Sequence, residues 1–133
     1  MPLFDSMHIS TSALTVERKR MEVISDNIAN VNSPRDKEGY MYQPRRLVSG
    51  PAPGAFTNHL ADFRELPRGG VEILGIHEEN NPPRMEYNPS HPYADKNGFV
   101  AYPDVNILDE MVNATIASRN YQANLTTFNE AKK

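Results

Sequence analysis

Apolar side chains recur at helical spacing in the first part of the chain. One stripe repeats at a seven-residue step as Met7, Leu14, Met21 and Ile28, joined later by Ile24 and Val31. A second, partial stripe consists of Ile9, Ala13, Val16 and Val23. The spacing predicts a helix over residues 6–31, whose two apolar faces suit several neighbours and equally an ordinary core. Pro34 ends it, because proline pushes the preceding residue out of the α region.

The last part of the chain predicts a second helix. Asn106 is a candidate N-cap, and Asp109 and Glu110 place negative charge in the first turn, where the helix dipole favours it. Apolar and small residues then follow in alternating steps of four and three, as Ile107, Met111, Ala114, Ser118, Tyr121, Leu125 and Phe128. This heptad seam predicts a helix to about Ala131, and we expect the N-terminal helix to bury the seam.

The residues between the helices have the pattern of short strands and turns. Strands are predicted over residues 40–48, 71–77, 84–87 and 99–102, and Pro44 confines the first to an edge. Asn97-Gly98 predicts a hairpin turn before the last strand. Residues 50–55 predict a loop, and the spacing of Phe56, Leu60 and Phe63 predicts a short helical turn. We expect the strands to form one small antiparallel sheet.

These elements define an α+β fold. Long N- and C-terminal helices pair as an antiparallel, coiled-coil-like hairpin, with a small Pro/Gly-rich antiparallel β portion between them in the sequence. The expected division is an N-terminal axial helix over residues 1–34, a β-rich middle over 35–103 and a C-terminal axial helix over 104–133.

Composition narrows the function classes. Hydrophobic residues make up 38% of the 133 residues, so the core is small and part of the stability should come from a partner or self-association. The net charge of −3 gives no case for nucleic acid as a partner. Since the chain has no cysteine, disulfides and thiolate metal sites are excluded. No apolar run is long enough for membrane insertion, and the first residues lack the pattern of a cleaved signal peptide.

The polar residues do not form a recognisable catalytic pattern. The four histidines, at positions 8, 59, 77 and 91, lack metal-ligand spacing, and His77 and Glu78 are adjacent strand residues that point to opposite faces. Asp95 is better suited to fixing a turn than to acid–base work. We therefore expect no catalytic, cofactor-binding or metal site, and no enzyme activity.

Asparagines are unusually frequent in both helices. Ala29-Asn30 and Ala123-Asn124 repeat one arrangement, a small residue followed by an amide. Alanine allows two helices to approach closely, and an amide at the contact can set their register. We therefore expect Asn30 and Asn124 to set register at a helix–helix contact, whereas Asn32 suits the helix end.

Three stretches resemble a known family. "SALTVERKRMEVISDNIANVNS" and "VNILDEMVNATIASRNYQANL" are similar to the N- and C-terminal signatures of the bacterial flagellar rod and hook axial proteins. "YNPSHPYADKNGFVAYPDVNILDEM" resembles the proximal-rod members in particular. Family members usually continue for further apolar turns beyond the position of Lys133, which is a departure of this sequence from the family pattern.

The resemblance implies a structural subunit of the flagellar proximal rod, the drive shaft of the basal body. It implies export through the flagellar type III apparatus without a cleaved signal, and a place in the part of the rod that spans the periplasm. The implied partners are other rod proteins and copies of the chain itself. A helical-hairpin adaptor that acts as a folded monomer is the alternative.

The resemblance and the apolar stripes together nominate residues for subunit packing. They are Leu14, Met21, Ile24, Asn27, Ile28, Ala29, Asn30, Met111, Ala114, Arg119, Tyr121, Ala123, Asn124, Leu125 and Phe128. We also expect both terminal segments to be mobile in the monomer and to fold on joining the rod, because the seam is large beside so small a core.

Overall fold

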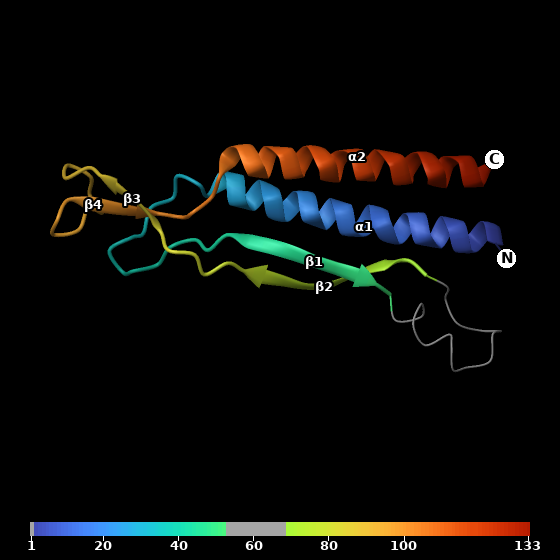
Figure 1. Ribbon diagram of the computed structural model, residues 1–133, viewed down its shortest axis with the longest axis horizontal. Coiled ribbons are helices and arrows are strands. Elements are labelled where there is room, and N and C mark those ends of the chain that lie inside the picture. Colours follow the sequence, from blue (N-terminus) through green and yellow to red (C-terminus); the bar gives the residue numbers. More distant parts are fainter. Residues whose placement is uncertain (1, 53–68) are drawn as a thin grey trace.

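The computed structural model describes residues 2–52 and 69–133. In this part of the chain two long helices lie side by side, and two antiparallel strand pairs accompany them (Figure 1). The elements are α1 (Pro2–Ala29), β1 (Arg45–Pro51), β2 (Val71–Glu78), β3 (Arg84–Tyr87), β4 (Phe99–Tyr102) and α2 (Ile107–Lys132). The α+β hairpin predicted from the sequence is confirmed. The short helical turn predicted at Phe56, Leu60 and Phe63 lies outside the described residues.

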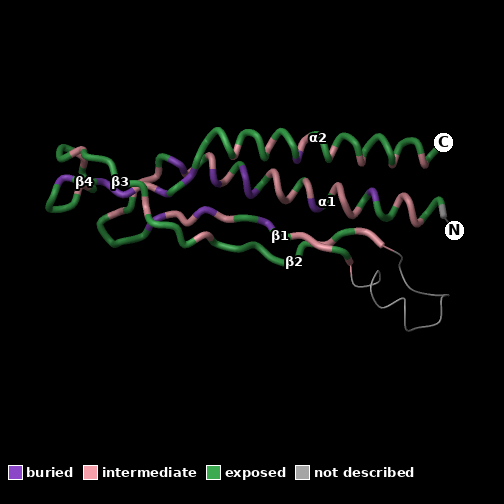
Figure 2. Tube along the Cα trace, in the orientation of Figure 1, coloured by how far each residue is buried: buried purple, intermediate pink, exposed green. Residues whose placement is uncertain are grey.

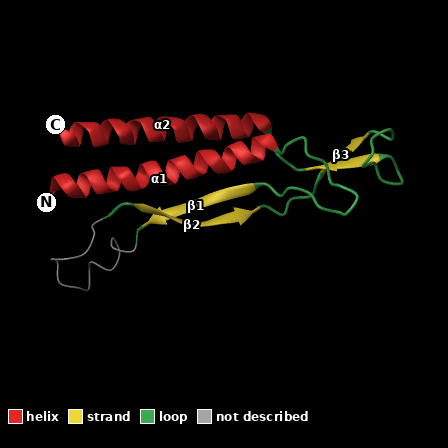
Figure 3. Ribbon diagram, turned by 180° about the vertical axis from the view of Figure 1, so that it is seen from behind, coloured by secondary structure: helices red, strands yellow, loops and turns green. Residues whose placement is uncertain are grey.

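The first helix, α1, lies between two neighbours. It packs along α2 on one side and against β1 and β2 on the other, an arrangement seen from both directions (Figures 1 and 3). Val16, Val23 and Ile24 are buried on α1, and Val100 and Pro103 are fully buried at β4 and in the loop after it (Figure 2). The two apolar faces of α1 are thus explained by two different neighbours, α2 and the β1–β2 ribbon.

Helix α1 ends before the position at which Pro34 would stop it. The last helical residue is Ala29, and the next turn tightens, with the backbone N–H of Val31 donating to Ile28 and that of Ser33 donating to Asn30. Bonds between residues three apart satisfy carbonyls that the α-helix leaves free at its end. The polar run after Ala29 therefore ends the helix before the proline.

The second helix, α2, begins as expected. The side chain of Asn106 accepts from the backbone N–H of Leu108 at 3.0 Å and of Asp109 at 3.4 Å, so the predicted N-cap is confirmed. The helix runs to Lys132, close to the predicted end at Ala131.

The seam predicted to face α1 is partly wrong. Ile107, Met111 and Leu125 are exposed, whereas Ala114, Tyr121 and Phe128 are half-buried and Ala117 is buried. Ser118, also in the predicted seam, is half-buried, and the covered positions outside the predicted seam include Glu110 and Asn124. They still follow steps of three and four, but the stripe is rotated around the helix toward small and polar residues. The heptad fit favoured large apolar side chains, and those lie mostly on other faces of α2.

The strands form two separate ribbons within the described residues, so the single sheet expected from the sequence is wrong. β1 pairs with β2 alongside α1, and β3 pairs with β4 beyond the far end of the helices (Figure 1). β1 begins at Arg45, after Pro44, because proline has no N–H for a ladder. It runs on to Pro51 opposite Val71, so the predicted loop begins inside a strand.

The β3–β4 connection is held by Asp95. Its carboxylate accepts from the backbone N–H groups of Asn97 at 2.8 Å and Phe99 at 2.9 Å, which confirms its predicted turn role. The two-residue hairpin turn predicted at Asn97-Gly98 is wrong. Only Gly98 has a positive φ, of 86°, and it closes the turn through a hydrogen bond from its N–H to the Asp95 carbonyl.

In the described part of the chain, neither helix has the length and apolar character that crossing a membrane requires.

Candidate assembly interface

Asn27 lies where α1, β1 and α2 meet. Its side chain is 2% exposed, and its Oδ1 accepts from the Tyr42 hydroxyl at 2.6 Å and from the backbone N–H of Arg45 at 3.0 Å. Its Nδ2 donates to the backbone carbonyl of Arg45 at 2.8 Å and lies 3.5 Å from Oε2 of Glu110. One buried amide therefore uses both of its polar atoms to join three segments distant in sequence, which offsets the cost of burying it.

Charged side chains surround this junction. Arg45 pairs with Asp26 on α1, and Arg46 Nε lies 2.8 Å from Oε1 of Glu79. Arg20 donates to the carbonyl oxygen of Leu47 at 3.2 Å and to the Ser49 hydroxyl at 2.8 Å. The contacts of Arg45 and Arg20 attach β1 to α1 through polar groups, and the Arg46–Glu79 pair joins β1 to the end of β2.

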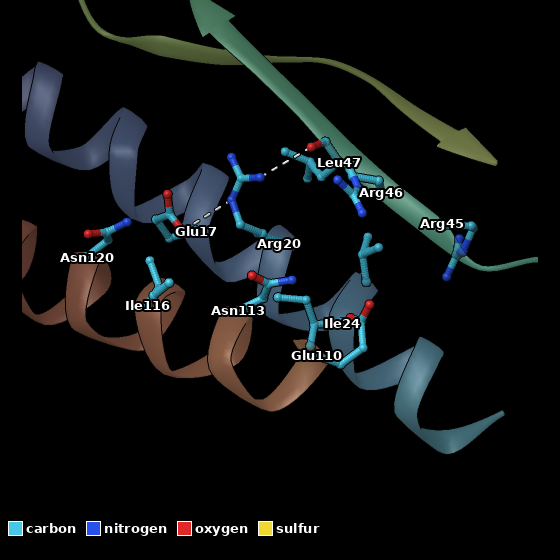
Figure 4. A pocket seen from close by; sticks show the side chains of 11 residues that line it. Glu17, Arg20, Ile24, Arg45, Arg46, Leu47, Glu110, Asn113, Ile116 and Asn120 are labelled. Carbon is cyan, nitrogen blue, oxygen red and sulfur yellow. Dashed lines mark hydrogen bonds and ion pairs between the residues drawn. The ribbon is translucent and has the colours of Figure 1, made fainter. Parts of the chain in front are cut away.

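A groove of about 310 Å³ opens where α1 passes between α2 and β1 (Figure 4). It is lined by Glu17, Arg20, Val23, Ile24, Arg45, Arg46, Leu47, Glu110, Asn113, Ile116 and Asn120. Arg20 Nε lies 3.4 Å from Oε2 of Glu17, an ion-pair distance without hydrogen-bond geometry. The mixture of both charge signs with amides suits contact with a polar protein surface more than a small apolar ligand.

Two groups beside Asn27 have perturbed acidity. Burial raises the pKa of Glu110, against the opposing effects of the hydrogen bond from Asn27 and the charge of Arg46. Burial likewise raises the pKa of the Tyr42 hydroxyl, which therefore stays protonated and able to donate to Asn27.

The residues nominated for packing on α1 differ in burial. Ile24 and Asn27 are buried, Leu14, Met21, Ile28 and Asn30 are half-buried, and Ala29 is exposed. Asn30 was expected to belong to the helix but is the first residue after α1; its Nδ2 donates to the carbonyl of Asp26 at 2.8 Å and its Oδ1 accepts from the Ser33 hydroxyl at 3.4 Å. The residues nominated on α1 are thus only partly buried within the single chain.

The residues nominated on α2 are mostly more exposed. Ala114, Tyr121, Asn124 and Phe128 are half-buried, whereas Met111, Arg119, Ala123 and Leu125 are exposed. Asn124 donates to the carbonyl of Asn120 at 2.8 Å, within its own helix. Because the helices run antiparallel, Asn30 and Asn124 lie near opposite ends of the pair and do not meet within one chain (Figure 1). Their role in register stays a prediction.

One face of α2 is apolar and faces solvent. Leu108, Met111, Val112 and Ile116 are each more than half exposed, and they line a shallow groove of about 380 Å³ with Thr115 and Arg119. The residues are spaced by three and four along about three turns, so they form one continuous surface. We call these six residues the outer α2 face. An apolar surface of this kind is typical of a protein–protein contact.

Sequence reasoning missed the polar junction. Asn27 was nominated for contacts between subunits, but its bonds to Tyr42 and Arg45 were not foreseen. The available signal was an amide inside an apolar helix face, which must find partners when buried. Nothing in the sequence marks Tyr42 or Arg45 as those partners.

Two family models match the ends of this chain. A flagella basal body rod protein model matches residues 7–35, and a flagellar basal body rod FlgEFG protein C-terminal model matches residues 96–133. These ranges contain most of both helices, the elements that build the interface described above. With the full-length relatives below, they show that the chain belongs to the flagellar basal-body rod proteins, a class of structural subunits.

Within that family the chain is FlgC-like. It is 36% identical to the flagellar basal-body rod protein FlgC of Borreliella burgdorferi, and equally to that of Salmonella typhimurium, over 99% of this chain and 92% of each relative. It is 33% identical to FlgC of Bacillus subtilis over 99% of this chain and 93% of the relative. The resemblance seen in the sequence to the rod proteins is thereby confirmed.

Proposed function

We propose that the chain is built into the rod through its helix pair, in contact with copies of itself and with other rod proteins. The observation that carries this proposal is the outer α2 face, an apolar surface that the chain does not cover with its own described residues. Burying it against a neighbour would recover hydrophobic free energy of about 25 cal/mol per Å². The role is structural, and catalysis has no part in it.

The proposed division of labour follows the chain. Residues 1–34 and 104–133 supply the axial helices, and residues 35–103 supply a β-rich portion. The hydrogen bonds between Asn27 and Arg45 support this division, because they attach the β-rich portion to α1 at a defined place.

The terminal helices are proposed to gain order on assembly. Within the described residues, Ala117 is the one side chain of α2 that is fully buried. A helix with so little buried surface has little to hold it in the free subunit. Amide hydrogen exchange on the purified monomer tests this: fast exchange along α2 is expected, and slow exchange throughout both helices would contradict it.

Asn30 and Asn124 are proposed to set helix register between subunits. Each is half-buried and donates to the carbonyl four residues earlier in the chain. Asn30 Oδ1 also accepts from the Ser33 hydroxyl at 3.4 Å, a long hydrogen bond that a donor from a neighbouring chain could replace. Asn30→Leu or Asn124→Leu should impair rod assembly more than export, and normal motility in both variants would argue against the idea.

Export through the flagellar type III apparatus, and a final place in the part of the rod that crosses the periplasm, complete the proposal. The support is the family membership.

A complementation experiment tests the proposed function. The chain is expressed in a motile bacterium whose own FlgC is deleted, and basal bodies are isolated and probed for it. The unaltered chain should be found in the rod and restore swimming. Val112→Asp, on the outer α2 face, should prevent incorporation, whereas Tyr40→Asp, at an exposed position away from both helices, should not. If neither the unaltered chain nor Tyr40→Asp is incorporated into the rod, the result would instead favour a monomeric adaptor.

A further inference from the structure

The outer edge of β1 is occupied by side chains of α1. Asn27 accepts from the N–H of Arg45 at 3.0 Å and donates to its C=O at 2.8 Å. Arg20 donates to the C=O of Leu47 at 3.2 Å. Arg45 and Leu47 are two residues apart, so their backbone groups point to the same edge of the strand. The other edge of β1 pairs with β2.

The Asn27 carboxamide bonds this edge as a neighbouring strand would. A primary carboxamide carries a C=O acceptor and two N–H donors in one plane. Its C=O and the N–H on the same side point in one direction, as the C=O and N–H of one residue of a β-strand do. Here both are directed at one residue of β1, which reproduces the paired N–H and C=O exchange of an antiparallel ladder. Asn27 is thus a side-chain substitute for one residue of a third strand.

The outer edge of β2 has different protection. Among the described residues no further strand pairs with it. The ladder shifts between Val48 and Ser49, where β2 has Leu74 as an extra residue, so the edge is bulged. Glu72 and Glu78 add negative charge near its two ends. Bulges and charges discourage a second chain from adding to an open edge.

We propose that Asn27, assisted by Arg20, closes the β1 edge and so prevents the free subunit from pairing edge to edge with other chains. The edge needs such closure because a strand with unpaired backbone groups is a template for aggregation. Val48, Val71 and Ile73 are exposed on the same ribbon, so uncontrolled pairing would also bury apolar surface. This function lies outside the assembled rod and does not depend on which neighbours the helices meet there.

The test compares Asn27→Ala with two matched variants of the full chain. Val23→Ala removes buried side-chain volume from the same helix and leaves the β1 edge covered. Asn30→Ala removes an amide that bonds Asp26 and Ser33, close to it in sequence, and makes no contact with the β1 edge. Thioflavin T fluorescence and the loss of soluble monomer are followed over time. Asn27→Ala and Val23→Ala are compared at urea concentrations that give equal unfolded fractions.

The expected result is faster formation of thioflavin-positive aggregate by Asn27→Ala than by Val23→Ala, with Asn30→Ala behaving as the unaltered chain. Equal rates for Asn27→Ala and Val23→Ala would overturn the proposal, because aggregation would then follow unfolding rather than an open edge. If Asn27→Ala has no helical circular dichroism, Arg20→Met takes its place, since it uncovers the Leu47 carbonyl. If Arg20→Met stays as soluble as the unaltered chain, the proposal is likewise overturned.

Discussion

The hydroxyl of Tyr42 donates a 2.6 Å hydrogen bond to Oδ1 of Asn27, fifteen residues earlier in the chain. The same oxygen accepts from the backbone of Arg45. Asn27 therefore holds both the segment that leads from α1 into β1 and the first residue of β1, and the direction in which the ribbon leaves α1 depends on this contact.

Tyr42→Phe should lower the free energy of unfolding by about 0.5–1.5 kcal/mol, the usual net value of one hydrogen bond. The loss is limited because Asn27 Oδ1 keeps its bond from the Arg45 N–H. Urea unfolding followed by circular dichroism measures it. Tyr40→Phe is the control, since Tyr40 is 71% exposed, and an equal midpoint for the two variants would contradict the assignment.

Glu110→Gln should stabilise the protein at neutral pH. The pKa of Glu110 is raised above its ordinary 4.5 by burial, so the folded state holds this proton more tightly than the unfolded state does. The charged carboxylate therefore lowers stability above the raised pKa, and this cost disappears as the pH falls toward 4.5.

Urea midpoints measured between neutral pH and pH 4 check this dependence. The gain of Glu110→Gln over the unaltered chain should shrink as the pH falls. Glu22→Gln, at an exposed position of α1, is the control. A gain for Glu110→Gln that is the same at every pH would show that burial of its charge is not the cause.

Asn106→Ala should destabilise α2 by about 1 kcal/mol, because the first-turn N–H groups of Leu108 and Asp109 lose their acceptor. Amide exchange should accelerate in the first turn of α2 before it does so further along. Asn129→Ala, on an exposed position near the other end of α2, should leave exchange in the first turn unchanged.

Gly98→Ala should cost about 1–3 kcal/mol for its left-handed backbone alone. An added Cβ would also lie 2.9 Å from Cε2 of Tyr87 and 3.2 Å from Cβ of Pro89. Gly39 has a similar φ of 89°, but no described atom lies within 4 Å of its added Cβ. Gly98→Ala should therefore lower the unfolding midpoint more than Gly39→Ala, and equal effects would show that the contacts yield without cost.

Local signals predicted much of the fold. Asn106 caps α2, Asp95 fixes its turn, and residues 84–87 and 99–102 are strands as expected, because each feature depends on near neighbours in sequence. Which residues of α2 face α1 could not be predicted in the same way. Met111 and Ala117 both lie in apolar patterns of α2, and nothing local tells which one faces α1 and which faces solvent.

The polar junction was beyond sequence reasoning for a related reason. Asn27 could be recognised as a buried amide in need of partners, but Tyr42, Arg45 and Glu110 reach it from segments up to 83 residues away. Partners of that kind follow from the tertiary arrangement and carry no periodic or motif signal.

The antiparallel helix pair has a mechanical consequence. The first turn of α1 and the last turn of α2 lie at one end of the molecule, and the β3–β4 ribbon lies at the other (Figure 1). A force that separates the two helix ends would open the pair from that end, one turn after another. A force between the first turn of α1 and the β3–β4 ribbon, which continues in sequence into α2, would instead load the whole length of the helix contact at once, in shear. A subunit that transmits load along its long axis therefore meets that load in its stiffer direction.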